Sequence, residues 1–265
     1  MHSTKLALEG CHNTRDLGGL PAGGGRAIRR GRLLRSDFLW KATESDERLL
    51  VSLGLRYIAD FRNRREHDEA PDRPISGATA LHLPVLPERA DGITHEQEDP
   101  LQRIRRQNGE LIEAGIDARE SMRGLYRRML QSDCALTAYR TFMQTLLQSG
   151  GATVLWHCSA GKDRAGVGSM LVEKALGVSD ADIREDYLAT NDCVWPAVSR
   201  DMEELRRMGA REDELETFRI YRMVDPSFFD TAMEELQPYG GLDGYLRLMG
   251  IGDAEREQLR ADYLD

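Results

Sequence analysis

The sequence predicts an α/β fold with a mainly parallel central sheet flanked by helices and a helix-rich C-terminal third. Strand-like apolar segments alternate with helical segments through the first two thirds of the chain, an order typical of parallel sheets with crossover helices. From Ser179 onward, nearly every segment has helical periodicity. No repeat, low-complexity tract or linker divides the chain, so we expect one domain over residues 1–265.

Local signals place the elements of the first half. Residues 18–40 combine glycine turns with short strands, and residues 44–54 have the spacing of a helix. A buried strand is predicted over residues 55–61. A short polar helix with proline turns follows over residues 63–74, and an alternating strand over residues 78–85.

The second half is predicted to be mainly helical around one strong strand. Residues 94–129 are polar and helical, and residues 134–150 form a strongly amphipathic helix. The apolar run at residues 152–158 is the clearest strand, and a helix follows from Arg164 to about Leu176.

Two polar helical segments, at residues 94–129 and 192–223, are candidates for a lid over a deep site, with a simple solvated face as the alternative. The lid would cover whatever site the central strand forms at its end.

Composition and charge describe an ordinary globular protein. The net charge of −9 disfavours general affinity for nucleic acid, and no apolar run approaches the roughly 20 residues that span a bilayer. The first ten residues lack the pattern of a Sec signal, so we expect a cytoplasmic protein or export by a non-Sec route. The four cysteines form no CxxC pair, which disfavours a zinc site or a disulfide framework.

The stretch VLWHCSAGKDRAGVGSMLVEKALG, residues 154–177, predicts an oxyanion site. A strand that ends in a short loop and opens a helix turns successive backbone N–H groups toward one point, and the helix dipole adds positive potential there. Arg164 can hold two phosphate oxygens with its planar fork. Cys158 lies at the floor of the same cradle, where the thiolate is favoured and can act as a nucleophile.

The remaining loop residues have supporting roles in this prediction. Ser159, Ala160 and Gly161 let the loop bend tightly around an anion, and His157 can hydrogen-bond to loop backbone as a structural histidine. A nucleotide-binding P-loop is excluded, because Gly161-Lys162 is followed by aspartate and no glycine precedes at the required spacing.

The segment HCSAGKDR resembles the signature of the cysteine-dependent phosphatases, and more narrowly that of the bacterial tyrosine phosphatase B family of dual- and triple-specificity enzymes. Three further segments are similar to that family: NTRDLGGL at residues 13–20, IADFRNRREHDE at residues 58–69, and the C-terminal helices at residues 239–264. The resemblance covers nearly the whole chain and implies a cysteine-phosphatase fold.

The resemblance also implies an activity and a substrate class. Cys158 would form a phosphocysteine intermediate, while Arg164 and the backbone of residues 159–163 would bind phosphate and the transition state. The implied substrates are phosphotyrosine proteins, together with phosphoserine, phosphothreonine and phosphoinositides, and no metal or cofactor is implied. Lys162 is linked to phosphoinositide acceptance, with electrostatic support of the thiolate as the alternative.

Protonation of the leaving group needs a carboxylic acid. Asp163, inside the loop, is the first candidate, with an ion pair to Lys162 or a helix N-cap as its alternative role. Asp60 is the second, with capping of the next helix or pairing with Arg62 or Arg64 as its alternative. The Trp-Pro-Asp loop of many tyrosine phosphatases is absent, because Trp195-Pro196 is followed by alanine.

Two further expectations follow from the family pattern. Arg15 and Asp16 are candidates to brace the phosphate loop by hydrogen bonding, with a pure turn motif as the alternative. Many of these enzymes carry serine or threonine directly after the arginine, where the hydroxyl assists departure of the thiolate. This chain has Ala165 there, which predicts a slower second step or another group in that role.

Two other functions compete with phosphate ester hydrolysis. A rhodanese-like sulfurtransferase also cradles an anion above a cysteine at a strand end, but the Cys-x5-Arg length and the loop aspartate favour phosphate. A non-catalytic phosphate-binding module is disfavoured because Cys158, Arg164 and an acid candidate are all present.

Overall fold

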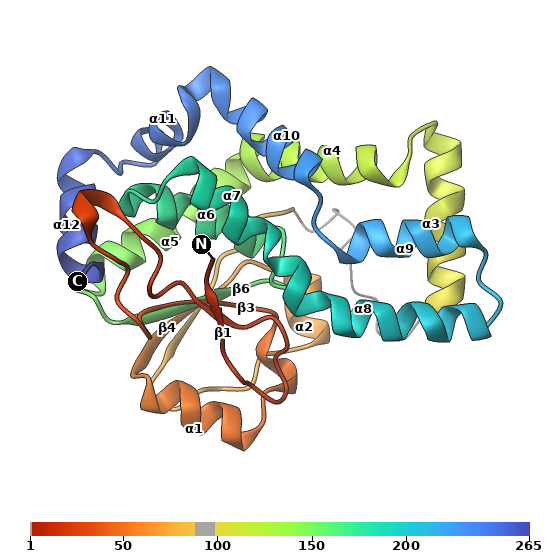
Figure 1. The fold of residues 1–265 in the computed structure, drawn as a ribbon, viewed down its shortest axis with the longest axis horizontal. Helices are drawn as coiled ribbons and strands as arrows, with labels where there is room; N and C mark the ends of the chain where they lie inside the picture. Colours follow the sequence, from red (N-terminus) through yellow and green to blue (C-terminus); the bar gives the residue numbers. More distant parts are fainter. Residues whose placement is uncertain (1, 88–98) are drawn as a thin grey trace.

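The computed structural model describes residues 2–87 and 99–265 (Figure 1). Within them, a sheet of six strands has the order β1-β2-β3-β6-β4-β5. The strands are Thr4–Lys5 (β1), Arg15–Asp16 (β2), Leu33–Ser36 (β3), Leu55–Asp60 (β4), Thr79–His82 (β5) and Thr153–His157 (β6). From β3 to β5 all pairs are parallel, and β1 and β2 extend the sheet antiparallel. The predicted α/β class with a mainly parallel sheet is confirmed.

Helices make up most of the remaining chain that the structure describes. They are Glu44–Ser52 (α1), Arg64–Glu69 (α2), Pro100–Ala114 (α3), Ala118–Gln131 (α4), Asp133–Gln148 (α5), Arg164–Leu176 (α6), Asp180–Leu188 (α7), Thr190–Arg207 (α8), Glu212–Arg222 (α9), Pro226–Leu236 (α10), Gly241–Leu248 (α11) and Asp253–Tyr263 (α12). No helix among the described residues is long and apolar enough to cross a membrane.

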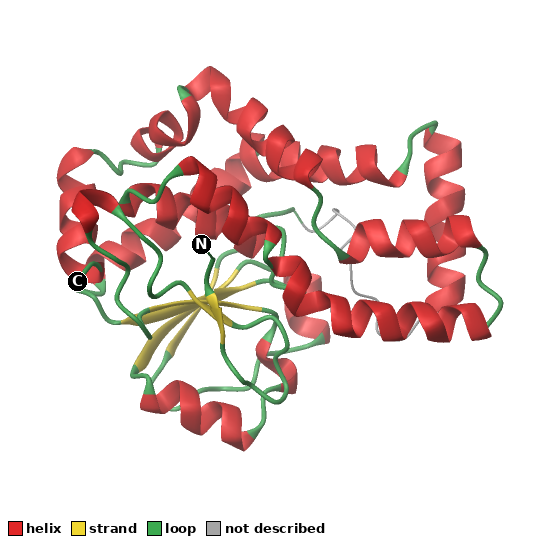
Figure 2. Cartoon of the chain, viewed as in Figure 1, coloured by secondary structure: helices red, strands yellow, loops and turns green. Residues whose placement is uncertain are grey.

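The central strands β3 and β6 are buried on both faces, and two sets of apolar side chains alternate along them. Leu34 and Leu155 pack with Leu50 of α1 on one face. Val154 and Trp156 join the larger cluster that includes side chains of α5 and α6 on the other. Figure 2 shows α1 below the sheet and the larger helical layer above it. Covering both faces explains why β6 reads as a continuous apolar run.

Three helices extend from this body on the side where the parallel strands end. Apolar residues of α3, α8 and α9, among them Ile104, Met202 and Phe218, form a cluster of their own. Figure 1 shows α3, α8 and α9 at the right, away from α1 and α12. Of the segments predicted as lid candidates, α3, α8 and α9 thus share a small core of their own, whereas α4 packs its apolar residues, among them Met122 and Leu125, into the main core.

Several element boundaries differ from the sequence prediction. The helix predicted over residues 94–129 consists of α3 and α4, separated at Gly115, whose φ of 66° ends α3; residues 94–98 lie outside the described residues. The strand predicted over residues 78–85 is limited to β5, and residues 18–32 contain a 3₁₀ turn over Gly23–Gly25 and isolated bridges before β3.

The register of the sheet brings three strand ends together. His157 at the end of β6 lies beside Ser36 at the end of β3 and beside Asp60 at the end of β4. Ligand sites of open parallel sheets form beyond the carboxyl ends of the strands. The loop after β6 therefore lies between the segments that follow β3 and β4.

Candidate active site

The loop between β6 and α6 forms the floor of a cleft of about 470 Å³. Cys158 is 2% exposed and lines this cleft together with Ser159, Asp163 and Arg164. The walls come from the segment before β2, the segment after β3 and the helical extension, and they include His12, Asp37, Phe38, Lys41, Arg103, Val194, Val198, Asp201 and Arg222. The predicted nucleophile and the predicted phosphate-binding arginine therefore meet at one cleft.

The backbone of the loop adopts the tight turn that the small residues predicted. Gly161 has a φ of 68°, and a Cβ atom there would lie 2.6 Å from the backbone at the end of β3. Positive φ combined with this close approach requires glycine. The loop is thus pressed against β3, and α6 begins at once with Arg164.

Glu66 of α2 holds the guanidinium of Arg164 in a bidentate pair. Nη1 donates to Oε2 at 2.5 Å and Nη2 to Oε1 at 2.8 Å. The hydroxyl of Ser159 also donates to Oε1, at 2.6 Å, and accepts from Nη2 at 3.2 Å. Burial alone would raise the pKa of Glu66, but the Arg164 charge and these hydrogen bonds lower it to about 2. Glu66 thus fixes the plane of the arginine fork.

No role for Glu66 was predicted from the sequence, although the family-like segment IADFRNRREHDE contains it. A local signal was present. Asn63 and Glu66 form a reciprocal capping box at the start of α2, which places Glu66 at the third helical position. The asparagine-to-glutamate spacing indicates a capped helix, but only the fold shows that this glutamate reaches Arg164.

A buried arginine holds the underside of the loop. Arg35 of β3 donates from Nη2 to the carbonyls of Gly161 (3.0 Å) and Lys162 (3.4 Å), and its Nη1 pairs with Asp186 of α7 at 3.2 Å. Asn13 donates from Nδ2 to the carbonyl of Ala160 at 2.9 Å. These two side chains brace the loop where the sequence analysis expected others.

The expectation that Arg15 and Asp16 bond to the loop is corrected by the structure. Arg15 donates to the carbonyl of Asp186 (2.9 Å) and to Thr190 (2.7 Å), so it reaches the loop only through Asp186 and Arg35. Asp16 accepts from the amides of Gly18 and Gly31, both at 2.8 Å. The carboxylate of Asp16 thus accepts hydrogen bonds from backbone amides of neighbouring turns, which is the role of a turn residue.

His157 lies fully buried between two carboxylates, directly before the nucleophile. Its Nε2 is 2.9 Å from Asp72 and its Nδ1 is 3.9 Å from Asp60 and 3.3 Å from the carbonyl oxygen of Cys158. Burial would lower the pKa of His157, but the charges of Asp72 and Asp60 raise it above its ordinary value. These contacts hold the His157 ring beneath the start of the loop, in the structural role that the sequence analysis expected.

Asp60 is engaged away from the cleft. Its two oxygens accept from Arg62 at 2.9 and 2.8 Å, and Oδ2 also lies 2.9 Å from Nδ1 of His67. Burial would raise the pKa of Asp60, but His157 and Arg62 lower it well below the ordinary value. Its oxygens are occupied by Arg62 and His67, and Asp60 is not among the residues that line the cleft. The structure therefore agrees with the alternative role given in the sequence analysis, in which Asp60 pairs with Arg62.

Asp163 faces the cleft with both oxygens engaged. Oδ1 accepts from the hydroxyl of Tyr126 (2.8 Å) and from Lys162 (3.1 Å), and Oδ2 lies 3.0 Å from Nζ of Lys162. Asp163 occupies the N-cap position of α6 but its side chain makes no capping bond. Its position beside Cys158 and Arg164 in the cleft wall suits a proton donor to a leaving group.

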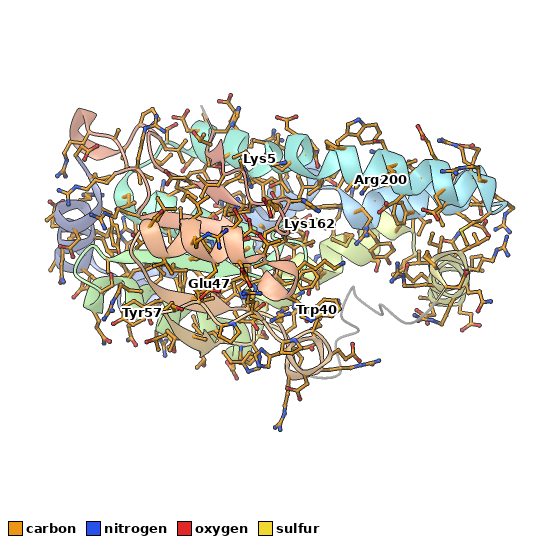
Figure 3. The ribbon with its side chains drawn as sticks, turned by 90° about the horizontal axis from the view of Figure 1, so that it is seen from below. Lys5, Trp40, Glu47, Tyr57, Lys162 and Arg200 are labelled. Carbon is orange, nitrogen blue, oxygen red and sulfur yellow. The ribbon has the colours of Figure 1, made fainter. Side chains whose placement is uncertain are left out.

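Lys162, which the sequence analysis linked to phosphoinositide acceptance, is not among the residues that line the cleft. Its side chain is fully buried, and Nζ also donates to the carbonyl of Met223 at 3.4 Å. Figure 3 shows Lys162 in the interior of the molecule. A buried ammonium needs charged partners, and here the partner is the carboxylate of Asp163. Any effect of the Lys162 charge on a bound substrate is therefore exerted through Asp163.

The structure also places two features of the sequence analysis, Ala165 after the arginine and the Trp195-Pro196 pair. Ala165 is fully buried in the first turn of α6, and the adjacent carbonyl of Arg164 accepts a 3.0 Å hydrogen bond from Tyr139. Trp195-Pro196 lies within α8, with Trp195 about half exposed, so it forms no mobile loop.

Two groups of side chains around Asp60 have potential metal-ligand atoms within 4.8 Å of one another. One contains Asp60, His67 and His82, and the other Asp60, Asp72 and His157. Both oxygens of Asp60 already accept from the guanidinium of Arg62. A cation would have to displace that guanidinium, so neither group fits a metal well.

The fold places a cysteine and an arginine together in a cleft at the end of a parallel strand, an arrangement typical of phosphatases that use a cysteine. A model of the tyrosine phosphatase family matches residues 6–265. The chain belongs to the tyrosine phosphatase family, and the resemblance found in the sequence is confirmed.

Individual relatives agree with this membership. A protein of Cupriavidus necator named as a tyrosine-protein phosphatase is 31% identical over 261 residues, covering 98% of this chain and 88% of that protein. The triple specificity protein phosphatase PtpB of Mycobacterium tuberculosis is 29% identical over 271 residues, covering 96% of each. A tyrosine-protein phosphatase of Nostoc commune is 24% identical over 246 residues, covering 91% of this chain and 76% of that protein.

Proposed function

We propose that the protein hydrolyses phosphotyrosine in proteins through a phosphocysteine intermediate on Cys158. The observation that carries this proposal is the arrangement at the cleft floor. A cysteine at the end of β6 shares the cleft with an arginine whose fork is held by Glu66. This arrangement suits a tetrahedral dianion above the sulfur.

The first step transfers the phosphoryl group to sulfur. The thiolate of Cys158 attacks phosphorus, the bond from phosphorus to the ester oxygen breaks, and Asp163 gives its proton to the leaving phenolate. Arg164 and the loop amides bind the equatorial oxygens. We assign the acid to Asp163 rather than Asp60, because Asp163 lines the cleft whereas Asp60 is paired with Arg62.

The second step regenerates the enzyme. Water attacks phosphorus, the sulfur–phosphorus bond breaks, and the carboxylate of Asp163 accepts a proton from the water. The products are inorganic phosphate and the free thiolate of Cys158. No metal takes part in this scheme, since the positive charge comes from Arg164, the loop amides and the start of α6.

We extend the proposal to phosphoserine, phosphothreonine and phosphoinositides. The name of the mycobacterial relative, a triple specificity protein phosphatase, supports this breadth. The cleft walls also carry Lys41, Arg103 and Arg222, whose charges suit anionic substrates of different shapes. A panel of phosphopeptides and of mono- and diphosphorylated inositol lipids would rank these substrates.

Release of phosphate from para-nitrophenyl phosphate tests the activity. We expect turnover that vanadate blocks, that a chelator leaves unchanged, and that Cys158→Ser abolishes. Cys134→Ser is the matched control, because Cys134 is a partly buried cysteine of α5 whose sulfur bonds to the carbonyl of Pro84. Full turnover by Cys158→Ser would overturn the proposal. Persulfide formation on Cys158 with a sulfur donor, without phosphate release, would instead indicate a sulfurtransferase.

A further inference from the structure

A buried tyrosine from outside the strand–loop–helix unit bonds to the acid of the proposed reaction. Tyr126 of α4 is fully buried, and its hydroxyl donates to Oδ1 of Asp163 at 2.8 Å. The same hydroxyl lies 2.7 Å from the hydroxyl of Tyr187 of α7. Neither tyrosine belongs to the segments that resemble known phosphatase motifs.

We propose that Tyr126 is a positioning residue for proton transfer: it anchors Oδ1 of Asp163, so that Oδ2 carries the proton given to the leaving group. This inference rests on the proposed function, in which Asp163 is the acid. It adds a residue from α4 to a reaction otherwise carried by the loop.

The direction of the hydrogen bonds follows from counting protons. A tyrosine hydroxyl has one proton. Tyr126 gives its proton to Asp163, so its oxygen accepts the proton of Tyr187. The order Tyr187 to Tyr126 to Asp163 polarises each hydroxyl toward the next acceptor. Oδ2 of Asp163, by contrast, is bound only by Lys162, at 3.0 Å, among the described residues.

The packing around Tyr126 keeps its hydroxyl in place. Its ring stacks on Phe228 of α10 with centroids 5.7 Å apart and meets the edge of Tyr187 at 6.3 Å. Tyr187 in turn packs against Phe229. Burial and the Asp163 charge raise the pKa of Tyr126 well above its ordinary value, so the hydroxyl remains a donor throughout the working pH range.

The charge change at Asp163 explains why this bond matters for the reaction. When Asp163 gives up its proton, it becomes a carboxylate, and a hydrogen bond to a charged acceptor is stronger than one to a neutral acid. Tyr126 therefore stabilises the charge that develops as the leaving group is protonated. Titratable and charged groups that face Asp163 are Cys158, Lys162, Arg164, Tyr126, Tyr139 and Tyr187.

The experiment compares two aryl phosphates with different leaving groups. Phenyl phosphate needs an acid because phenolate is a poor leaving group, whereas para-nitrophenolate departs readily without one. Tyr126→Phe should lower kcat/KM for phenyl phosphate roughly 10-fold more than for para-nitrophenyl phosphate, the effect of one hydrogen bond to a charged group.

Two reference variants make the result specific. Asp163→Asn should lose roughly 100-fold or more with phenyl phosphate and much less with para-nitrophenyl phosphate. Tyr245→Phe is the matched control, because Tyr245 is a buried tyrosine whose hydroxyl donates to the carbonyl of Leu130 at 3.0 Å, away from the cleft. It should leave the ratio between the two substrates unchanged.

The outcomes separate this proposal from the proposed function. Selective loss in Asp163→Asn with equal losses for both substrates in Tyr126→Phe would overturn the role of Tyr126 and leave Asp163 as the acid. Equal losses in Asp163→Asn would overturn both assignments. If Tyr126→Phe does not fold, Tyr187→Phe takes its place, because it removes the donor to Tyr126. In Tyr187→Phe, a smaller selective loss of kcat/KM for phenyl phosphate would support the proposal. An unchanged ratio between the two substrates would overturn it.

Discussion

The guanidinium of Arg164 is held mainly by one carboxylate. Both of its terminal nitrogens donate to the carboxylate of Glu66, and both side chains are nearly inaccessible. A buried bidentate pair has little freedom to rotate, and its loss leaves an uncompensated charge. The pair therefore fixes the plane of the guanidinium that we propose binds phosphate, and it holds α2 against the loop.

Replacing Glu66 with glutamine tests this dependence. The variant keeps the shape but loses the charge, so we expect weaker vanadate binding and a free energy of unfolding lower by about 1–3 kcal/mol at neutral pH. Glu69→Gln is the control, because Glu69 forms an exposed pair with Arg65 that contributes little. Inhibition by vanadate and urea unfolding measure the two effects. Unchanged vanadate affinity in Glu66→Gln would contradict the positioning role.

The same residue gives a pH dependence of stability with a defined sign. The pKa of Glu66 falls from an ordinary 4.5 to about 2 in the folded protein. Protons therefore bind the unfolded chain more tightly, and the stabilisation by Glu66 is complete above pH 4.5 and is lost as the pH falls toward 2. The difference in stability between wild type and Glu66→Gln should shrink over this window in urea titrations. A constant difference would contradict it.

Ala165 predicts the kinetics of the second step. No side-chain hydroxyl is present at this position to assist departure of the thiolate, so phosphocysteine should accumulate. Para-nitrophenyl phosphate should give a pre-steady-state burst, and Ala165→Ser should raise steady-state turnover by up to about 10-fold, the effect of one hydrogen bond. Ala175→Ser, on the same helix, is the control. Absence of a burst in the wild type would contradict the prediction.

At the scale of elements, the phosphate loop depends on its contact with the end of β3. Gly161 combines a positive φ with an approach that leaves no room for a Cβ atom. Arg35 of β3 holds two carbonyls of the same turn from below. The loop is therefore shaped by a neighbouring strand as well as by its own residues.

Gly161→Ala should separate these two constraints. Gly54 has a similar φ of 72°, but a Cβ atom there would meet no described atom within 4 Å, so Gly54→Ala carries only the backbone strain of about 1–2 kcal/mol. Gly161→Ala adds a clash with β3 and should be less stable than Gly54→Ala and nearly inactive. Thermal unfolding and phosphatase assays measure both. Equal stability of the two variants would show that the loop can move away from β3.

The whole molecule is tied together by a buried charge network beneath the site. Asp186 of α7 pairs with Arg35 at 3.2 Å and with Arg15 at 3.5 Å, and it accepts from the amide of Ser3 at 2.6 Å. These contacts join the N-terminal segment, two strands and α7 to the loop carbonyls held by Arg35. Burial would raise the pKa of Asp186, but the two arginines and Ser3 lower it to about 2.

Asp186→Asn should therefore be strongly destabilising. It leaves two buried guanidinium groups without their carboxylate, which typically lowers the free energy of unfolding by about 3–5 kcal/mol. Asp180→Asn is the control, because Asp180 forms a largely exposed pair with Lys174 that is worth about 0–1 kcal/mol. Urea unfolding compares the variants. Similar stability of the two would show that the network does not hold the molecule together.

The unit of strand, loop and helix to which we assign the chemistry can be predicted from the sequence. Apolar residues before Cys158, small residues to Gly161 and helical periodicity after Arg164 are local patterns, and β6, the loop and α6 form where these patterns placed them. Backbone propensity and amphipathic period act over a few residues, so they can be read without knowing the fold.

Tertiary structure alone decided the partners of that unit. Glu66 lies 98 positions before Arg164, Arg35 lies 126 before Gly161, and Tyr126 lies 37 before Asp163. The tertiary structure also buries the side chain of Lys162 against Asp163 and pairs Asp60 with Arg62. Hydrogen bonds and ion pairs of this kind depend on which distant elements pack together, and a local pattern records the period of each element but not its neighbours.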